Sequence, residues 1–354
     1  MRPRTRWIRD ARRILAVGFS ILVIAGMAYE QVGRVRERRR LVHIGTSYDV
    51  GGRTLNLHCV GSGGPTVILD AGANDPGYAW AVIQAHVAPF ARVCWWDRAG
   101  FGWSAPGPYP MTLTVIAKDL HDLLHVANIP GPYVLVGYSF GGFVVRVYHG
   151  IYPAEVRGMV LVDAAHEDAG ARIPAWGRAL MPPIPVPLRY PVYLAAETLA
   201  ASGVVRLLRH PRPFSAPGWT PEQAHVLMDV RSRSDVVAAD ASIGLFNDEN
   251  ERQVRASGGL RDTPLLVLTA GLPLSVPPQF ATSAAAYQEV WKHELQPQLA
   301  RLSSRGRQVI VAEAGHGMAF EMPEVVVGAI RDVVRQSLDF STSAAKESGL
   351  PLAR

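Results

Sequence analysis

The chain has 354 residues, of which 48% are hydrophobic and 19% charged, and these proportions exclude a wholly disordered protein and suit one large domain with an insertion. The net charge is +6, but residues 1–40 alone hold eleven arginines against three acidic residues. The rest of the chain therefore has a net charge of −2, and its composition does not suggest a basic surface. We expect no nucleic acid partner.

The first 40 residues predict an association with a membrane. Six arginines precede an uncharged run over residues 14–29, and five more follow it. At about 1.5 Å per residue the run reaches about 24 Å, slightly less than a hydrocarbon core of about 30 Å. We expect a signal anchor that leaves the following domain outside the cytoplasm. A cleaved signal peptide, with Gly26 and Ala28 near the cleavage site, is the alternative, and a buried core helix is less favoured.

From residue 41 the chain alternates short apolar strands with helices, a pattern typical of a mostly parallel sheet covered by helices on both faces. The strands are predicted at residues 53–60, 66–70, 92–97, 133–137, 159–163, 264–269 and 308–312, with an antiparallel edge at 43–50. Helices are predicted at residues 79–91, 112–126, 141–151 and 324–338. We expect the core to comprise residues 41–163 and 259–340, followed by a loose tail over residues 341–354.

About a hundred residues separate the strand that ends at Asp163 from the next one, and no crossover in a compact fold needs that length. The first half of the interval is rich in proline and apolar residues, whereas the second half has helical character and an N-cap signal at Thr220. Residues 164–258 are therefore predicted to form a mostly helical cap.

One motif carries the chemistry. An apolar strand runs into Gly137-Tyr138-Ser139-Phe140-Gly141, which matches G-x-S-x-G, and a helix follows. Glycines on both sides let the chain turn sharply, so that the Ser139 hydroxyl stands at the carboxyl end of the strand. This junction favours a nucleophilic serine over a structural one.

A nucleophilic serine needs a histidine base and an acid that orients the base. Of the eleven histidines, His316 follows the last predicted strand, on a loop that ends before a helix. His121, His125 and His149 fall on predicted helices, where a surface or packing role is favoured.

With these motifs the chain resembles the α/β-hydrolase superfamily, and within it serine esterases and lipase-like enzymes related to epoxide hydrolases and haloperoxidases. The resemblance rests on the serine motif, on residues 97–104 (DRAGFGWS), which look like a D-x-x-G-x-G-x-S loop, and on Gly315-His316. It implies an α/β-hydrolase fold with a mostly parallel eight-stranded sheet and a helical cap inserted after the sixth strand. A serine nucleophile argues for acyl transfer to water and against epoxide hydrolase and dehalogenase chemistry.

The resemblance also suggests the catalytic acid. The order in the superfamily is Ser, acid, His, and similar enzymes place the acid after the seventh strand or at the end of the sixth. No carboxylate follows the seventh strand closely here, so Asp163, 24 residues after Ser139, is preferred. Glu294 and Glu289 are the fallback, and Glu313 is nearer to His316 in sequence. A helix N-cap is the structural alternative for Asp163.

The same resemblance implies an oxyanion hole built from the backbone N–H of Phe140 and one from the loop after the third strand. The Ala73 N–H is the candidate there, and the Asn74 side chain is a possible additional donor. Asp97 and Arg98 are interpreted as structural ties of their loop.

In the implied fold the strands that carry Cys59 and Cys94 are neighbours, and a disulfide between them would suit an exported protein. Two unrelated buried thiols are the alternative.

Together these patterns predict a serine hydrolase that cleaves an ester-like substrate of hydrophobic character through an acyl-enzyme, with Ser139, His316 and Asp163 as the triad. No metal or organic cofactor is expected, because no Cys/His ligand cluster or phosphate loop is found. The alternatives are a membrane-anchored, non-catalytic binding protein on the same scaffold, or amidase, C–C hydrolase or perhydrolase chemistry on the same triad.

Overall fold

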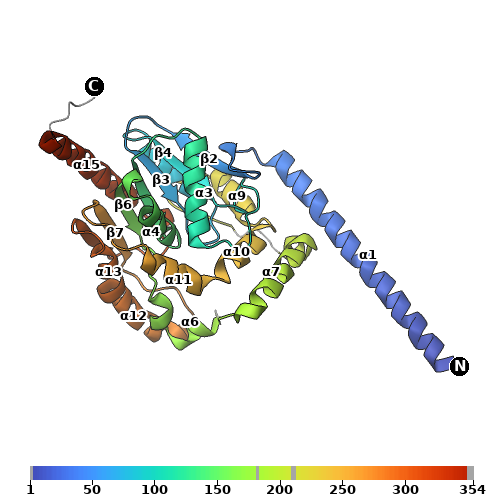
Figure 1. The fold of residues 1–354 in the computed structure, drawn as a ribbon. Coiled ribbons are helices and arrows are strands. Elements are labelled where there is room, and N and C mark those ends of the chain that lie inside the picture. The colour runs from blue at the N-terminus through green and yellow to red at the C-terminus, as the bar shows by residue number, and fades with distance from the viewer. Residues whose placement is uncertain (1–2, 181–182, 209–212, 349–354) are drawn as a thin grey trace.

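The computed structural model describes residues 3–180, 183–208 and 213–348. Figure 1 shows a layered domain, with a long N-terminal helix projecting from one side and the C-terminal helix on the opposite side. All strands belong to one eight-stranded sheet, in the order β1-β2-β4-β3-β5-β6-β7-β8. They are β1 (Thr46–Asp49), β2 (Thr54–Val60), β3 (Thr66–Asp70), β4 (Val93–Asp97), β5 (Tyr133–Tyr138), β6 (Val156–Val162), β7 (Leu265–Ala270) and β8 (Gly306–Val311).

Only β2 breaks the parallel direction, because it pairs antiparallel with both β1 and β4, whereas the strands from β4 to β8 are parallel. The expected fold class is confirmed, and the predicted strands match the observed ones to within a few residues. The antiparallel edge is shorter than predicted, since β1 is limited to four residues.

Helices cover both faces of the sheet, and alternation along the strands divides the core in two. On β5, Leu135 faces one core, which includes α3 (Leu113–Val126) and α4 (Gly141–Ile151). Val134 and Val136 face the other, with α2 (Ala81–Val87) and α15 (Pro323–Ser348). Short elements complete the domain: η1 (Gly77–Trp80), η2 (Pro153–Glu155), η3 (Pro278–Phe280), α12 (Ala281–Val290), η4 (Trp291–Leu295), α13 (Gln296–Ala300) and α14 (Met318–Glu321).

The segment between β6 and β7 is helical wherever it has regular structure. It holds α5 (Ala169–Arg172), α6 (Ala175–Leu180), α7 (Val186–Ala201), α8 (Val204–Leu208), α9 (Pro221–Arg231), α10 (Val236–Gly244) and α11 (Asn247–Ala256). The predicted N-cap is present, because the Thr220 hydroxyl accepts the Gln223 N–H at 3.2 Å. We call residues 164–258 the cap segment, and their status as a separate unit remains a prediction.

Three helices differ from expectation. The Pro-rich half of the cap segment also forms a helix, α7, in which Pro187 lies in the first turn, where no intrahelical N–H is needed, whereas Pro191 lies inside the helix. The helix predicted at 79–91 is replaced by η1 and the shorter α2. The helix predicted at 324–338 extends to Ser348, into the segment predicted as a loose tail, since no glycine or proline interrupts α15 after Gly328. Residues 349–354 lie outside the described part.

The N-terminal helix α1 (Pro3–Arg40) contains the apolar run and continues through the arginines after it. Its segment Arg12–Glu37 is long and apolar enough to cross a membrane, with only 6% of the most apolar window buried. Its described apolar side chains are almost all exposed, from Ile14 at 73% to Tyr29 at 49%.

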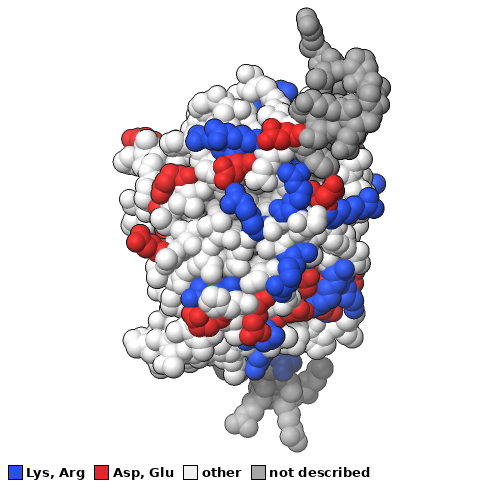
Figure 2. Space-filling model, turned by 90° about the vertical axis from the view of Figure 1, so that its left-hand side faces the viewer, with Lys and Arg blue, Asp and Glu red and all other residues white. Residues whose placement is uncertain are grey.

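The surface away from α1 has a different character. Figure 2 shows that face, on which basic and acidic side chains alternate without a large area of one sign. This mixture agrees with the small net charge of the chain after residue 40.

Cys59 on β2 and Cys94 on β4 stand directly opposite each other and form a disulfide, with their Cα atoms 4.1 Å apart. The pairing expected from the implied fold is therefore confirmed, and the alternative of two unrelated thiols is wrong. Disulfides persist in oxidising compartments, which agrees with an exported domain.

We expect the double variant Cys59→Ala/Cys94→Ala to unfold more easily. The bond joins residues 35 apart, and closing a loop of that length removes chain entropy worth about 4 kcal/mol from the unfolded state. Guanidinium unfolding of the detergent-solubilised chain measures the loss, with reduced wild-type protein as the control. Equal unfolding midpoints for the oxidised wild type and the double variant would contradict a stabilising bond.

Candidate active site

The sharp turn after β5 positions Ser139. Its φ is 51°, in the left-handed region that a non-glycine residue occupies only under constraint. The turn is tight on both sides: a Cβ on Gly137 would lie 2.5 Å from the Gly141 carbonyl oxygen, and a Cβ on Gly141 would lie 2.4 Å from the Asp70 carbonyl oxygen. Glycine is thus required at both positions, and the serine stands between the end of β5 and the start of α4.

The loops after β6 and β8 bring the other two candidate residues to Ser139. His316 Nε2 lies 3.0 Å from Ser139 Oγ, and His316 Nδ1 lies 2.6 Å from Asp163 Oδ2. The His316 side chain is 40% exposed, whereas that of Asp163 is 4% exposed. The Tyr138 hydroxyl donates to the His316 carbonyl at 2.9 Å and so fixes the histidine loop. The structure therefore assembles the three residues that the sequence suggested.

Asp163 is oriented by donors on its second oxygen. Oδ1 accepts the Ala270 N–H at 2.9 Å and the Trp291 indole N–H at 2.8 Å, which leaves Oδ2 to face His316. Like Ser139, Asp163 has a positive φ, 40°. Sequence reasoning missed Trp291, because no motif marks an indole 128 residues from its carboxylate.

The fallback acids lie elsewhere. Glu294 pairs with Arg172 at 2.8 Å, and Glu289 pairs with Lys292 at 2.5 Å; both glutamates are about half or more exposed. Glu313 is also exposed. Among the contacts of the described residues, the Asp163 carboxylate is the only one that lies next to the His316 ring.

The candidate oxyanion donors lie around the same turn. Phe140 directly precedes α4 (Gly141–Ile151), so no turn of that helix supplies an acceptor for its N–H. Gly72 comes close to the Tyr138 ring, since a Cβ there would lie 3.0 Å from it. Ala73 and Asn74 are exposed. The Asn74 amide nitrogen, oriented to donate, meets the Asp240 carboxylate of α10 at 2.5 Å, so this side chain contacts the cap segment.

A buried ion pair supports the loop after β3. Arg98 donates to Asp70 Oδ1 and to the Ala71 carbonyl, each at 2.9 Å, and also to the Gly72 carbonyl. Its guanidinium lies 5.2 Å from the centre of the Phe140 ring. Burial raises the pKa of Asp70 to about 6, although the charge of Arg98 opposes the rise. Arg98 thus joins the two segments that carry the candidate oxyanion donors.

Asp97 connects three segments. Its carboxylate accepts the Gly77 N–H at 2.7 Å, the Trp103 N–H at 2.9 Å and the Asn56 side-chain amide at 2.9 Å. Burial raises the pKa of Asp97, and these hydrogen bonds oppose the rise. The interpretation of Asp97 and Arg98 as structural ties is confirmed by these contacts.

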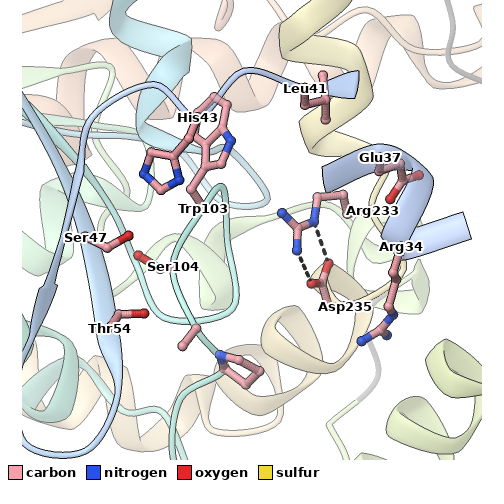
Figure 3. Close-up of a pocket in the computed structure, with 12 residues that line it drawn as sticks. Arg34, Glu37, Leu41, His43, Ser47, Thr54, Trp103, Ser104, Arg233 and Asp235 are labelled. Carbon is pink, nitrogen blue, oxygen red and sulfur yellow. Dashed lines mark hydrogen bonds and ion pairs between the residues drawn. The ribbon is translucent and has the colours of Figure 1, made fainter. Parts of the chain in front are cut away.

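Two features lie apart from the triad. His121, His125 and Glu155 bring possible metal-binding atoms within 4.8 Å of one another, a grouping that the sequence did not reveal. There His121 stacks on Tyr152, with ring centres 3.8 Å apart. Figure 3 shows a pocket of about 470 Å³ between the end of α1 and the domain, where Arg233 and Asp235 form an ion pair.

Comparison with known proteins identifies the family of the fold. Residues 65–322 match the model of a family described as the alpha/beta hydrolase fold. The chain belongs to this family. The match covers the sheet from the end of the β2–β3 loop, the serine turn, the cap segment and the histidine loop.

The individual relatives are distant. An uncharacterized protein of Schizosaccharomyces pombe is 26% identical over 66% of the chain, and 2-hydroxy-6-oxo-2,4-heptadienoate hydrolase of Pseudomonas putida is 28% identical over 60% of the chain and 75% of its own length. A thermophilic esterase from Thermogutta terrifontis has a TM-score of 0.55 and 21% identity, with 82% of the chain and 98% of the esterase aligned. The chain spans two fifths or less of the first curated relatives.

We expect Arg98→Met to destabilise the protein by about 3–5 kcal/mol, because it leaves the Asp70 carboxylate buried without its counter-charge. The loss of stability should grow as the pH rises above 6. Burial already holds the pKa of Asp70 in the folded protein above its value in the unfolded chain, and removal of Arg98 raises it further. Ionisation of Asp70 above pH 6 therefore opposes folding more strongly in the variant than in the wild type. Chemical unfolding across pH measures it. Arg307→Met is the control, because the Arg307–Asp332 pair is about half exposed and is worth about 1 kcal/mol or less. Similar losses for both variants would contradict the role of Arg98.

Proposed function

We propose that the protein is a serine hydrolase that cleaves carboxylic esters through an acyl-enzyme on Ser139. The observation that carries the proposal is the continuous chain of hydrogen-bond distances from Ser139 Oγ through His316 to Asp163, 3.0 and 2.6 Å long. Such a chain suits a serine that must lose its proton as it attacks, because the base is in contact with the hydroxyl and the acid holds the base in place.

In the first half of the reaction, Ser139 Oγ bonds to the ester carbonyl carbon and its proton passes to His316 Nε2. The tetrahedral intermediate then expels the alcohol, which takes that proton from His316. In the second half, a water molecule gives a proton to His316 and attacks the acyl carbon, and Ser139 leaves with the proton. Asp163 stays ionised throughout and stabilises the charged imidazole.

Negative charge on the substrate oxygen is proposed to be stabilised by the N–H groups of Phe140 and Ala73. Arg98 supports this geometry, because it bonds to the carbonyls of Ala71 and Gly72 and lies over the Phe140 ring. The engagement of Asn74 with Asp240 gives its side chain a second role, as a contact between this loop and the cap segment.

The proposed location is outside the cytoplasm, with the chain held in a membrane by α1. Two observations support this: the exposed apolar segment of α1, which is flanked by arginines, and the disulfide between β2 and β4. The substrate is proposed to be hydrophobic, in keeping with an enzyme that works beside a bilayer.

We expect an alkyl fluorophosphonate to label the full chain on Ser139. Ser139→Ala should remove the label and lower kcat for p-nitrophenyl esters by at least about 10³ while the fold is retained, because the triad acts as a unit. Mass spectrometry of the labelled peptide and a circular dichroism spectrum of the variant check this. Labelling elsewhere, or turnover by folded Ser139→Ala protein, would refute the proposed nucleophile, and an unlabelled wild type would favour a non-catalytic binding protein.

We also expect Asp163→Asn to lower kcat for p-nitrophenyl esters by about 10³ or more, because the amide selects the wrong histidine tautomer. Glu294→Gln is the matched control, since it makes the same acid-to-amide change at an exposed ion pair with Arg172. Its kcat should stay within about twofold of wild type. The opposite ranking of the two variants would move the acid to the Glu294 segment.

A further inference from the structure

Outside α1, the exposed large hydrophobic side chains gather on two helices of the cap segment. Nine of them lie on α7 and α8, whereas the rest of the described chain beyond α1 holds seven, scattered singly over several elements. The nine are Val186, Leu188, Tyr190, Val192, Leu194, Leu199, Val204, Leu207 and Leu208. A concentration of this kind marks a surface that meets a partner or a membrane.

Helix α7 contacts the protein along one narrow stripe. Arg189, Tyr193, Ala196 and Ala201 are half-buried, Ala200 is buried, and every other residue of the helix is exposed. On that exposed circumference Glu197 is the one charged residue. A helix that presents apolar side chains to water over most of its surface is destabilised unless something apolar covers it.

The contact between α1 and the cap segment indicates what covers it. Gly26, within the apolar run of α1, touches the backbone between α7 and α8: a Cβ on Gly26 would lie 2.3 Å from the Ser202 carbonyl oxygen, and one on Gly203 would lie 2.5 Å from the Gly26 carbonyl oxygen. The two segments therefore meet backbone to backbone, as small residues allow.

Ion pairs next to this contact fix its geometry. Arg206 of α8 donates to Glu30 at 2.9 Å and also bonds Glu37. Glu30 is fully buried and accepts from Arg34 and Ser234 as well. Farther along, Arg40 pairs with Asp229 of α9 at 2.5 Å. The position of α1 therefore determines the position of α7 and α8.

These contacts predict how deep the junction of α7 and α8 would lie in a bilayer that contains the apolar run of α1. Gly26 precedes the end of the apolar run at Tyr29 by three residues, or about 5 Å of helix. If the run lies in a bilayer, the junction of α7 and α8 lies about that far below its edge, which is the depth at which interfacial helices bury their apolar faces. Figure 1 shows that α7 approaches α1 with one end and runs away from it at a steep angle, below the rest of the domain.

We propose that α7 and α8 are a second membrane-binding surface, which lies in the plane of the leaflet from which α1 emerges. The partner is the lipid bilayer itself: acyl chains cover the nine hydrophobic side chains, and the exposed Arg36 and Arg39 of α1 lie at the level of the headgroups. This inference rests on the proposed insertion of α1.

Site-specific fluorescence quenching on the full chain tests it. Leu188→Cys and Leu207→Cys, each labelled with an environment-sensitive fluorophore under non-reducing conditions so that Cys59 and Cys94 stay paired, are reconstituted into vesicles of phosphatidylcholine and phosphatidylglycerol. Leu338→Cys is the control, because Leu338 is similarly exposed at 44% but lies on α15, away from α7. Ile21→Cys reports on α1 itself.

We expect lipids with a spin label on the acyl chain to quench positions 188 and 207 at least about twofold more strongly than position 338, and iodide in the water to do the reverse. Quenching by lipid at position 21 alone, with positions 188 and 207 as open to iodide as position 338, would overturn the inference and leave the α1 anchor intact. Absence of lipid quenching at position 21 would refute the anchor, and the inference with it.

Discussion

The turn at Ser139 is the constraint on which the rest of the site depends. A residue with a side chain is held at a φ of 51° because the chain must leave a buried central strand and enter α4 at once. The close approaches of Gly137 to Gly141, and of Gly141 to Asp70, leave no room for the turn to relax. This strain stays in place because a buried strand and a buried helix adjoin it on either side.

A rigid serine is useful for the proposed chemistry only if His316 and Asp163 lie next to it, and the topology of the sheet places them there. Because β5, β6, β7 and β8 are parallel neighbours, their carboxyl ends share one edge. The turns after β5, β6 and β8 carry Ser139, Asp163 and His316, and the helical segment after β7 carries Trp291. Asp163 also has a positive φ, and it uses one oxygen for Ala270 and Trp291 and the other for His316. The carboxylate is thus oriented by the backbone at the end of β7 and by an indole of the following helical segment.

The strands and the candidate nucleophile were predictable because their signals are local: a continuous apolar strand followed by G-x-S-x-G needs no knowledge of distant contacts. The choice of Asp163 over Glu294 as candidate acid came instead from the resemblance to enzymes that place the acid at the end of the sixth strand. Trp291 and the Asn74–Asp240 contact were not predictable, since each depends on a partner more than a hundred residues away. Helix α7 was not predicted as an individual element, because its half of the interval was described only as rich in proline and apolar residues; in the structure Pro187 lies in the first turn, where proline is tolerated, and Pro191 lies inside the helix.

The second arginine cluster illustrates how a sequence pattern changes meaning once partners are known. By charge alone, the arginines that follow the apolar run oppose translocation of the domain across a membrane. In the structure two of them are paired, Arg34 with Glu30 and Arg40 with Asp229, while Glu30 and Glu37 both engage Arg206 of α8. This part of α1 is therefore a docking element for the folded domain as well as a flank of the apolar run. If α1 lies in a membrane as proposed, a helix docked in this way fixes the position of the cap segment relative to that membrane. The cap segment in turn contacts the loop after β3 at two places: Arg231 of α9 pairs with Asp75, and Asp240 of α10 lies beside the Asn74 side chain. These two contacts connect the docked helix to the loop that carries the proposed oxyanion donor Ala73.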